Sequence, residues 1–473
     1  MRYALLLASA ALALSTHSAN AQQTLLLKQP SVSAQNLAFV YAGDIWVANR
    51  DGSDPRRLTS HPAEENSPSI APDGSMIAFA ASYEDNLDVY IIPVAGGQPT
   101  RLTWHPGEDY PTGWTSDGTA VTFISARETD HGRSGQLYHA SVDGGLPTKQ
   151  MEARIFRGVY GEDDSRLAYI AFGSGYNGLF GDTSGWKGYR GGTTPPILIM
   201  DMAGQTVSTV PGAGATNFNP FWMNDQLYFL SDRDNGLFNV HRYDPSSGSI
   251  DKVSDEQVWE VRSADGHGSA IVYEAGGRLM NLDLGSGQAS EIMITISPDL
   301  PQLRTQWKNA DSTIQAVDIS PSGKRAIITA RGEVFTVPVD EGSTRNISGT
   351  GDKREYSGIW SPDGDRVAYI VESDTGQSLV IADQSGMGDS QKYELGPFFY
   401  ELIEWAPGDD GRILLEDNHL SLYAMELASG KISKIAAGTR RDTVEATVSP
   451  DGRWLAYTLE MPNYHRDLIL RNF

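Results

Sequence analysis

Short stretches of alternating apolar and polar residues, separated by polar turns, recur along almost the whole chain. The clearest copy joins alternating segments at 76–79 and 88–94 to a short polar segment at 100–103. Alternation with a period of two predicts half-buried β-strands, because successive side chains of a strand point to opposite faces. No sustained helical period is visible. The pattern therefore predicts an all-β chain made of small antiparallel meanders.

Turns of the Ser-Pro-Asp-Gly type mark the repeats, because Pro fixes φ and Gly accepts a positive φ. Successive turn glycines lie 44 residues apart from Gly74 to Gly118 and 41 residues apart from Gly323 to Gly364. This spacing is typical of the four-stranded blades of β-propellers. The third strand of the meander is expected ten times, at 44–47, 88–94, 136–138, 197–200, 237–240, 278–281, 333–336, 378–381, 420–423 and 467–470.

Ten blades exceed the four to eight of one ring, so we expect two rings. Pro298 and Pro301 interrupt the pattern, which restarts at Ser312. The expected organisation is a six-bladed β-propeller at 22–300, a linker at 301–311, and an incomplete second, seven-bladed type of β-propeller at 312–473 with about four blades. Since the fourth of these blades lacks its closing strand, we expect the chain to be truncated at its C-terminus.

The first 21 residues have the features of a cleaved signal peptide. Arg2 precedes an apolar run at 4–14, and a small-x-small site at 19–21 follows it. No later stretch approaches the roughly 18 apolar residues of a membrane helix. We therefore expect a periplasmic or secreted protein of bacterial type without membrane insertion.

Composition narrows the classes of function. The 473 residues include 37 Lys and Arg against 60 Asp and Glu, a formal net charge of −23, and there is no Cys. A chain with this much negative charge repels nucleic-acid phosphates. We therefore expect no nucleic-acid partner. The lack of thiols excludes disulfides, a Cys nucleophile and thiolate metal sites.

The sequence resembles the tricorn-type proteases, whose N-terminal half consists of a six-bladed and then a seven-bladed propeller. The strongest match is the segment 186–193, Trp-Lys-Gly-Tyr-Arg-Gly-Gly-Thr, which is similar to an insertion in the fourth blade of the first propeller of that family. The segments 37–46 and 331–335 are similar to the openings of the two rings. The resemblance covers the whole chain after the signal peptide.

The resemblance implies that the propellers perform no chemistry themselves. They would select unfolded peptides and channel them to a serine-protease core of the carboxyl-terminal-processing type (peptidase S41) with a PDZ module, none of which is present here. The family also holds a substrate carboxylate with a basic pair in a loop of the first propeller. The corresponding stretch at 104–109 contains no Arg, so the resemblance assigns no such anchor there.

Motif searches identify no catalytic, cofactor-binding or metal-binding residues. A Gly-x-Ser-x-Gly pentapeptide is missing, and the nine His are scattered over different blades. The segment 173–178 has the letters of a dinucleotide fingerprint but no following helix. The segment 232–236 resembles the start of a calcium loop, but Arg242 stands where the bidentate Glu is needed. Both segments are interpreted as loops, and no cofactor is expected.

The insertion at 173–196 is the segment whose composition favours binding. It carries the aromatic residues Trp186 and Tyr189 beside the cations Lys187 and Arg190. These residue types can grip a peptide by stacking and carboxylate pairing. The alternative is that Trp186 and Tyr189 only pack the loop onto the ring.

Two hypotheses of function follow. The first is a substrate-recognition and gating part of an exported tricorn-like serine protease, not catalytic by itself, with unfolded peptides or the missing protease region as partners. The second is a periplasmic propeller similar to TolB that binds proteins of the cell envelope. The reading frame after Phe473 would discriminate between them.

Overall fold

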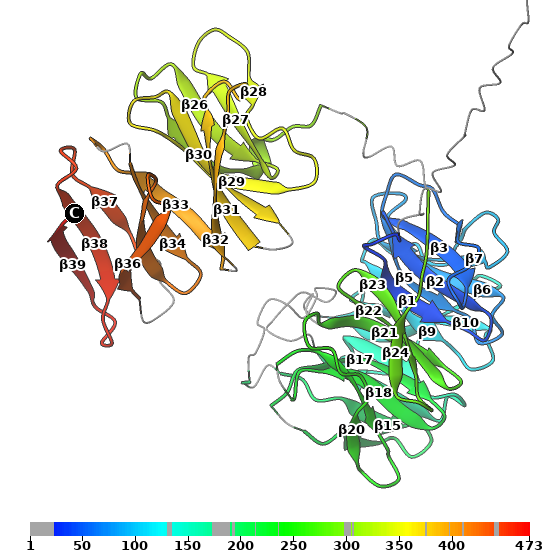
Figure 1. The fold of residues 1–473 in the computed structure, drawn as a ribbon. Coiled ribbons are helices and arrows are strands. Elements are labelled where there is room, and N and C mark those ends of the chain that lie inside the picture. The colour runs from blue at the N-terminus through cyan, green and yellow to red at the C-terminus, as the bar shows by residue number, and fades with distance from the viewer. Residues whose placement is uncertain are drawn as a thin grey trace, which may run out of the picture. The chain divides into compact units, whose positions relative to one another are not determined.

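The structure is a computed structural model, and it confirms the all-β fold class. It describes residues 23–473 except 130–134, 173–189, 192–193, 213, 235, 298–303, 305–306, 374–375, 397, 409–410 and 439–443. The chain divides into two compact units, Met1–Leu303 and Arg304–Phe473 (Figure 1). Among the described residues, no helix reaches the length and apolarity needed to cross a bilayer.

The described part of the first unit forms six antiparallel sheets, each made of four consecutive strands. They are β1 (Lys28–Val32), β2 (Asn36–Tyr41), β3 (Asp44–Asn49) and β4 (Arg56–Arg57); β5 (Glu65–Ile70), β6 (Met76–Ala81), β7 (Asp88–Pro93) and β8 (Thr100–Arg101); β9 (Asp109–Trp114), β10 (Ala120–Ser125), β11 (Gln136–Ser141) and β12 (Thr148–Lys149); β13 (Arg157–Tyr160), β14 (Arg166–Ile170), β15 (Leu198–Asp201) and β16 (Thr206–Thr209); β17 (Asn217–Met223), β18 (Gln226–Ser231), β19 (Asn239–Tyr243) and β20 (Ile250–Lys252); and β21 (Val261–His267), β22 (Ala270–Ala275), β23 (Arg278–Asp283) and β24 (Gln288–Glu291).

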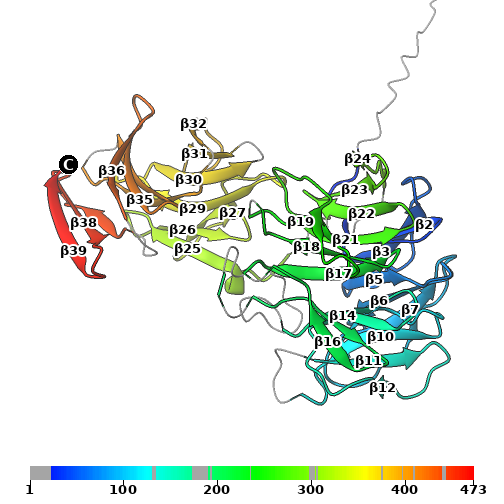
Figure 2. The ribbon, with the colours of Figure 1, turned by 90° about the horizontal axis from the view of Figure 1, so that it is seen from below.

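The first strands of these sheets surround a common centre (Figure 2). Contacts run from β1 through β5, β9, β13, β17 and β21, and β21 contacts β1 again, so the ring is closed. Asp265 on β21 makes part of the closing contact, because its Oδ2 accepts hydrogen bonds from Ser31 Oγ and Val32 N, both at 2.9 Å. The backbone N of Thr24 also donates to Ile294 O at 2.9 Å.

The apolar core lies between neighbouring sheets rather than at the centre of the ring. Ile45 of the first sheet and Phe79 of the second, both fully buried, belong to one cluster. Phe39 of the first sheet and Val272 of the sixth belong to another, which spans the closing contact. Each sheet therefore buries both faces against its neighbours, the packing that radial repetition of sheets produces.

The turns predicted from the Pro-Asp-Gly pattern are confirmed. Asp73 Oδ1 accepts a hydrogen bond of 2.9 Å from Ser75 N, and Gly74 takes a φ of +76°. A left-handed φ costs Gly little because it has no Cβ. The turn thus reverses the chain between β5 and β6.

The second unit repeats the same sheet plan. Its described residues form three sheets of four strands, one sheet of three and a short 3-10 helix, Asp311–Thr313. The strands are β25 (Ile314–Ile319), β26 (Arg325–Ala330), β27 (Glu333–Pro338) and β28 (Arg345–Asn346); β29 (Arg354–Trp360), β30 (Arg366–Ser373), β31 (Gly376–Asp383) and β32 (Gln391–Gly396); β33 (Tyr400–Trp405), β34 (Arg412–Asp417), β35 (Ser421–Glu426) and β36 (Lys431–Ala437); and β37 (Ala446–Val448), β38 (Trp454–Glu460) and β39 (Arg466–Asn472). Contacts run in series from β25 to β29, β33 and β37.

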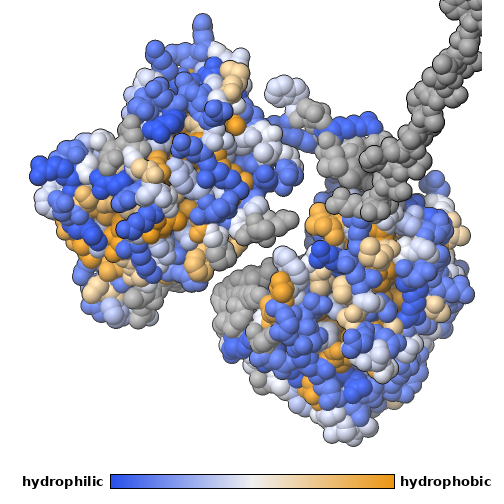
Figure 3. Space-filling view, in the orientation of Figure 1, coloured by the Kyte–Doolittle hydropathy of each residue, from blue (hydrophilic) through white to orange (hydrophobic). Residues whose placement is uncertain are grey.

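The first and last sheets of this series expose apolar side chains. Val317 and Ile319 on β25 are 61% and 59% exposed, and Leu468 on β39 is 76% exposed. Apolar patches are visible on the surface of the unit in Figure 3. By contrast, β1 in the closed ring ends in three buried residues.

Candidate functional site

The candidate site lies at the end of the first ring where the first strand of each sheet begins, which we call the entry face. In a four-stranded meander, the connection from the second to the third strand opens at this same end. The long connection between β14 and β15, which contains the sequence-predicted loop, therefore belongs to the entry face. Of the four predicted contact residues, Trp186, Lys187 and Tyr189 lie outside the described residues, and Arg190 lies within them.

Arg190 connects the long loop to the next sheet. Its Nη1 donates to Asp232 Oδ2 at 2.7 Å, and the Asp232 side chain is only 1% exposed. Asp232 Oδ1 also accepts a hydrogen bond of 2.9 Å from Thr216 N. Since a buried carboxylate needs such partners, this ion pair anchors the C-terminal end of the loop.

Asp234, two residues after Asp232, bonds to a side chain of the next strand. Asp234 Oδ2 lies 3.0 Å from Nε2 of the buried His241. Burial lowers the pKa of His241, which favours the neutral imidazole. In the parts of the chain that the structure describes, no cluster of His, Asp and Glu could hold a metal ion.

In several sheets, a hydroxyl two residues after the fourth strand accepts a hydrogen bond from the third strand. At Thr59 the contact continues into the next sheet, because its Oγ1 accepts from Ile45 N and donates to Glu65 Oε2, both at 2.8 Å. Equivalent hydroxyls accept a hydrogen bond from the backbone N of the second residue of a third strand. These bonds join Thr103 to Val89, Ser254 to Val240 and Ser348 to Val334. These hydroxyls fix the ends of the fourth strands, and Thr59 also joins the first two sheets of the ring.

The carboxyl group of Glu65 has a strongly raised pKa. Its side chain is 1% exposed, and Tyr83 Oη donates to its Oε1 at 2.8 Å. Burial raises the pKa of Glu65 to about 7, against the lowering effect of the hydrogen bonds from Thr59 and Tyr83. The neighbouring Asp44 is paired with Arg57 at 2.7 Å, and burial also raises the pKa of Asp44.

The stretch at 104–109 contains no Arg, but in the structure two arginines from outside the stretch contact it. Arg127 Nη2 donates to both oxygens of the buried Asp109, at 2.8 and 2.6 Å. Arg101 pairs with Asp88 at 2.7 Å and lies 5.9 Å from the centre of the Trp104 ring. Both guanidinium groups are thus engaged by carboxylates of the ring, while Trp104 itself is 58% exposed.

A groove of about 360 Å³ crosses the inner strands of the second unit. Residues of β25, β29 and β33 line it, among them Val317, Ile359 and Leu402. Asp318 Oδ2 is occupied by a hydrogen bond of 2.9 Å from Trp360 N. The groove is open and exposes more polar than apolar surface, so it can accommodate an extended chain.

Nucleophilic catalysis would need a base beside a hydroxyl. Among the residues that the structure describes, the His ring nitrogens with hydrogen-bonding partners contact backbone groups or Asp234, and none bonds to a Ser hydroxyl.

A ring of consecutive four-stranded antiparallel sheets, with the first strands around the centre, defines a β-propeller. The chain belongs to the family of the tricorn protease N-terminal β-propeller domain, whose family model matches residues 24–288. The resemblance to tricorn-type proteases is thereby confirmed.

Curated relatives match over nearly the whole chain. Tricorn protease homolog 1 of Streptomyces coelicolor is 24% identical over 94% of this chain and 42% of its own length. The tricorn protease homolog of Saccharolobus solfataricus is 23% identical over 93% of this chain and 40% of its own length. The crystal structure of the tricorn protease aligns with a TM-score of 0.60 at 18% identity, over 95% of this chain and 43% of that chain. The chain thus spans about two fifths of the length of these proteins.

Sequence reasoning missed the ion pair of Arg190 with Asp232 and the acidic cluster around Glu65. The first joins residues 42 positions apart, and no local pattern marks it. The second has a weak signal, since Thr59 and Glu65 have the same spacing as Thr103 and Asp109. Only the sheet plan shows that Thr59 and Glu65 bridge adjacent sheets.

Proposed function

We propose that this chain is the substrate-recognition and gating part of an exported tricorn-like serine protease of the S41 type. It binds unstructured peptides and is not catalytic by itself; peptide-bond cleavage belongs to a protease core outside these 473 residues. The observation that carries the proposal is the match of the tricorn propeller family over 24–288. The open groove across β25, β29 and β33 supports it, because an extended peptide fits such a surface.

The test combines peptide binding with peptide cleavage by the purified chain. We expect labelled unstructured peptides to bind and fluorogenic peptides to stay intact. Turnover that survives repurification and disappears when a Ser or His of this chain is replaced would contradict the proposal. So would selective binding of folded envelope proteins with no binding of peptides, which is the outcome expected of a TolB-like propeller.

Export to the periplasm, or secretion, is proposed from the signal-peptide pattern of residues 1–21. Expression in a Gram-negative host, followed by mass spectrometry of the N-terminus, tests it. A mature chain starting at Gln22 in the periplasmic fraction is expected. An uncleaved chain that stays in the cytoplasm would exclude export in that host.

A further inference from the structure

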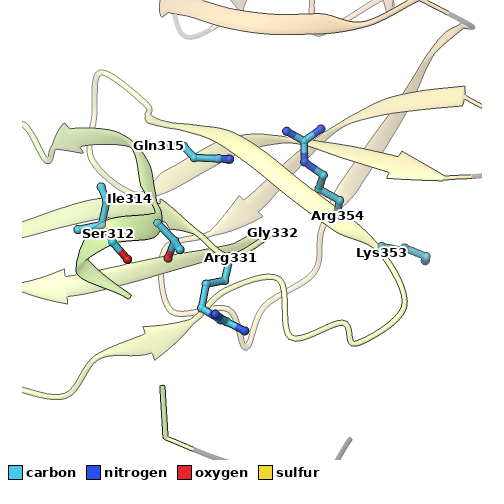
Figure 4. Close-up of a pocket in the computed structure, with 8 residues that line it drawn as sticks. Ser312, Ile314, Gln315, Arg331, Gly332, Lys353 and Arg354 are labelled. Atoms are coloured by element: carbon cyan, nitrogen blue, oxygen red, sulfur yellow. The ribbon is translucent and has the colours of Figure 1, made fainter. Parts of the chain in front are cut away.

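A basic pocket lies between the first two sheets of the second unit. It has a volume of about 580 Å³ and is formed by three chain segments (Figure 4). These are the start of β25 with the 3-10 helix before it, the turn between β26 and β27, and the start of β29. The residues lining it are Ser312, Thr313, Ile314, Gln315, Arg331, Gly332, Lys353 and Arg354. Three of the eight are cations, and none is a carboxylate.

The three cations of the pocket differ in whether they already form an ion pair within the protein. Arg354 Nη1 pairs with Glu372 at 2.8 Å, and its guanidinium stacks 4.5 Å from the centre of the Tyr356 ring. Arg331 and Lys353 are exposed, and neither forms an ion pair with a described residue. Two positive charges are thus available in a chain whose net charge is −23.

The neighbouring carboxyl group does not cancel these charges. Glu355 follows Arg354 but is fully buried and accepts a hydrogen bond from Thr350 Oγ1. Burial raises the pKa of Glu355, which favours its neutral form. The side chains that line the pocket thus include cations and no carboxylate, a composition that attracts an anion.

The first unit provides a comparison on the same backbone. Glu65 N donates to Gly43 O at 2.8 Å, and Glu355 N donates to Gly332 O at 2.7 Å, so these positions correspond. By this correspondence, Ala42, Ala63 and Glu64 stand where the second unit has Arg331, Lys353 and Arg354. The fold forms this corner without any of the three cations, so the cations are not required by the architecture.

The backbone at Arg331 supports the same conclusion. Arg331 and Gly332 take φ values of +55° and +77° in a two-residue hairpin turn. Such turns favour Gly or Asn at both positions, because a Cβ is unfavourable at positive φ. Ala42 takes the same φ of +55° at the corresponding position of the first unit, so the turn does not require the cationic side chain of Arg331.

We propose that this pocket binds a carboxylate of an unstructured peptide, either its C-terminal carboxylate or the side chain of an Asp or Glu. The inference rests on the proposed peptide-binding function and adds a ligand chemistry to it. Arg331 supplies a planar pair of donors and Lys353 a point charge, the two cation types that pair with carboxylates in proteins. Ser312, which also lines the pocket, adds a hydroxyl.

The experiment measures binding of three unstructured, otherwise neutral peptides to the full chain by fluorescence anisotropy. One peptide ends in a free carboxylate, one in an amide, and one in an amide with a single internal Glu. A carboxylate is expected to tighten binding about tenfold, and raising the salt concentration is expected to reduce that gain. The double variant Arg331→Gln/Lys353→Gln should lose the gain and still bind the neutral peptide.

Two controls keep the result interpretable. Lys324→Gln/Arg453→Gln removes two exposed cations from turns at the opposite end of the sheets and should leave the gain unchanged. Arg331→Gly removes one pocket cation while relieving the strained φ, so it should fold normally and reduce the gain. Arg331→Lys keeps a cation at this position and should therefore retain part of the gain in affinity that the carboxylate gives.

The peptide arms separate the two sources of the carboxylate. A gain with the free C-terminus alone, with the internal Glu alone, or with both supports the pocket and identifies its ligand. Equal affinity for all three peptides, or a gain that persists in Arg331→Gln/Lys353→Gln, overturns the pocket and leaves the proposed function intact. Failure of every peptide to bind overturns the proposed function and this inference with it.

Discussion

Glu65 is a carboxyl group that the fold keeps close to half-protonated near neutral pH. Its folded pKa of about 7 lies above the usual 4.5, so the folded state binds more protons than the unfolded state between these values. Stability from this group is therefore complete below about pH 4.5 and is lost as the pH rises through 7. The loss is on the order of 3 kcal/mol at most.

The variant Glu65→Gln tests this dependence, because Gln resembles the protonated acid in shape. Urea unfolding at pH 5 and pH 8 should show a smaller loss of stability with rising pH in the variant than in the original chain. Glu64→Gln, at the adjacent position, is the control and should behave like the original chain. Equal pH dependence in Glu65→Gln and the original chain would show that Glu65 titrates normally.

Asp265 has a different task, since it connects the sixth sheet to the first. Asp265→Ala would leave the buried Val32 N without its acceptor, at a cost of about 2–3 kcal/mol in the free energy of unfolding. Denaturant unfolding measures this change. Asp389→Ala, at an exposed position, should change stability by less than about 0.5 kcal/mol. An Asp265→Ala variant as stable as this control would show that the ring closes without the carboxylate.

At the residue scale, the sequence did not reveal which groups pair within the fold. Arg190 was expected to pair with a carboxylate of a bound peptide, whereas in the structure it pairs with Asp232 of the same chain. Arg331 lies in a turn, and Lys353 and Arg354 lie at the start of β29 more than 20 residues later, so no sequence motif joins them. Such groupings depend on which sheets become neighbours, and periodicity cannot show that.

At the scale of elements, alternation located the strands well because it reflects burial directly. Each of the ten expected third strands has a counterpart in the structure, such as β3 at Asp44–Asn49 for 44–47. The strand predicted at 237–240 starts later in the structure, because β19 begins at Asn239. Phe238 is buried and packs 4.9 Å from the Phe218 ring before the strand begins, so an apolar residue extended the pattern into the loop.

The repeated turns give a prediction at the same scale. Gly364 takes a φ of +79° in the turn between β29 and β30. Gly364→Ala should lower stability by about 1–2 kcal/mol, because a Cβ is unfavourable in this conformation. Gly351→Ala is the matched control, since its Cβ would meet open space and its φ is not in the left-handed range. Similar thermal unfolding of the two variants would contradict the strain argument.

At the scale of the whole molecule, every buried apolar cluster among the described residues lies within one unit. The cluster around Phe39 and Val272 closes the first ring, and the cluster around Tyr356 and Leu415 belongs to the second unit. Since cooperative unfolding follows shared cores, we expect two calorimetric transitions. Sheets that expose Val317 and Leu468 should make the second unit the less stable one.

The variants Asp265→Ala and Gly364→Ala show which unit unfolds in each transition, because Asp265 lies in the first unit and Gly364 in the second. Asp265→Ala should lower the midpoint of one transition and Gly364→Ala that of the other. A single transition that both variants shift equally would show that the units unfold together.

The first ring has a further consequence, because each of its sheets is made of consecutive strands and no strand is exchanged at the closing contact. Thr24 N and Ile294 O already bond at 2.9 Å, so the ends of the ring are adjacent. The order of the sheets around the centre is therefore cyclic, and the place where the chain starts is arbitrary. Circular permutation, with residues 23 and 296 joined and new termini placed in another connection between sheets, should preserve the ring. Gene duplication can likewise add a sheet without rethreading the others.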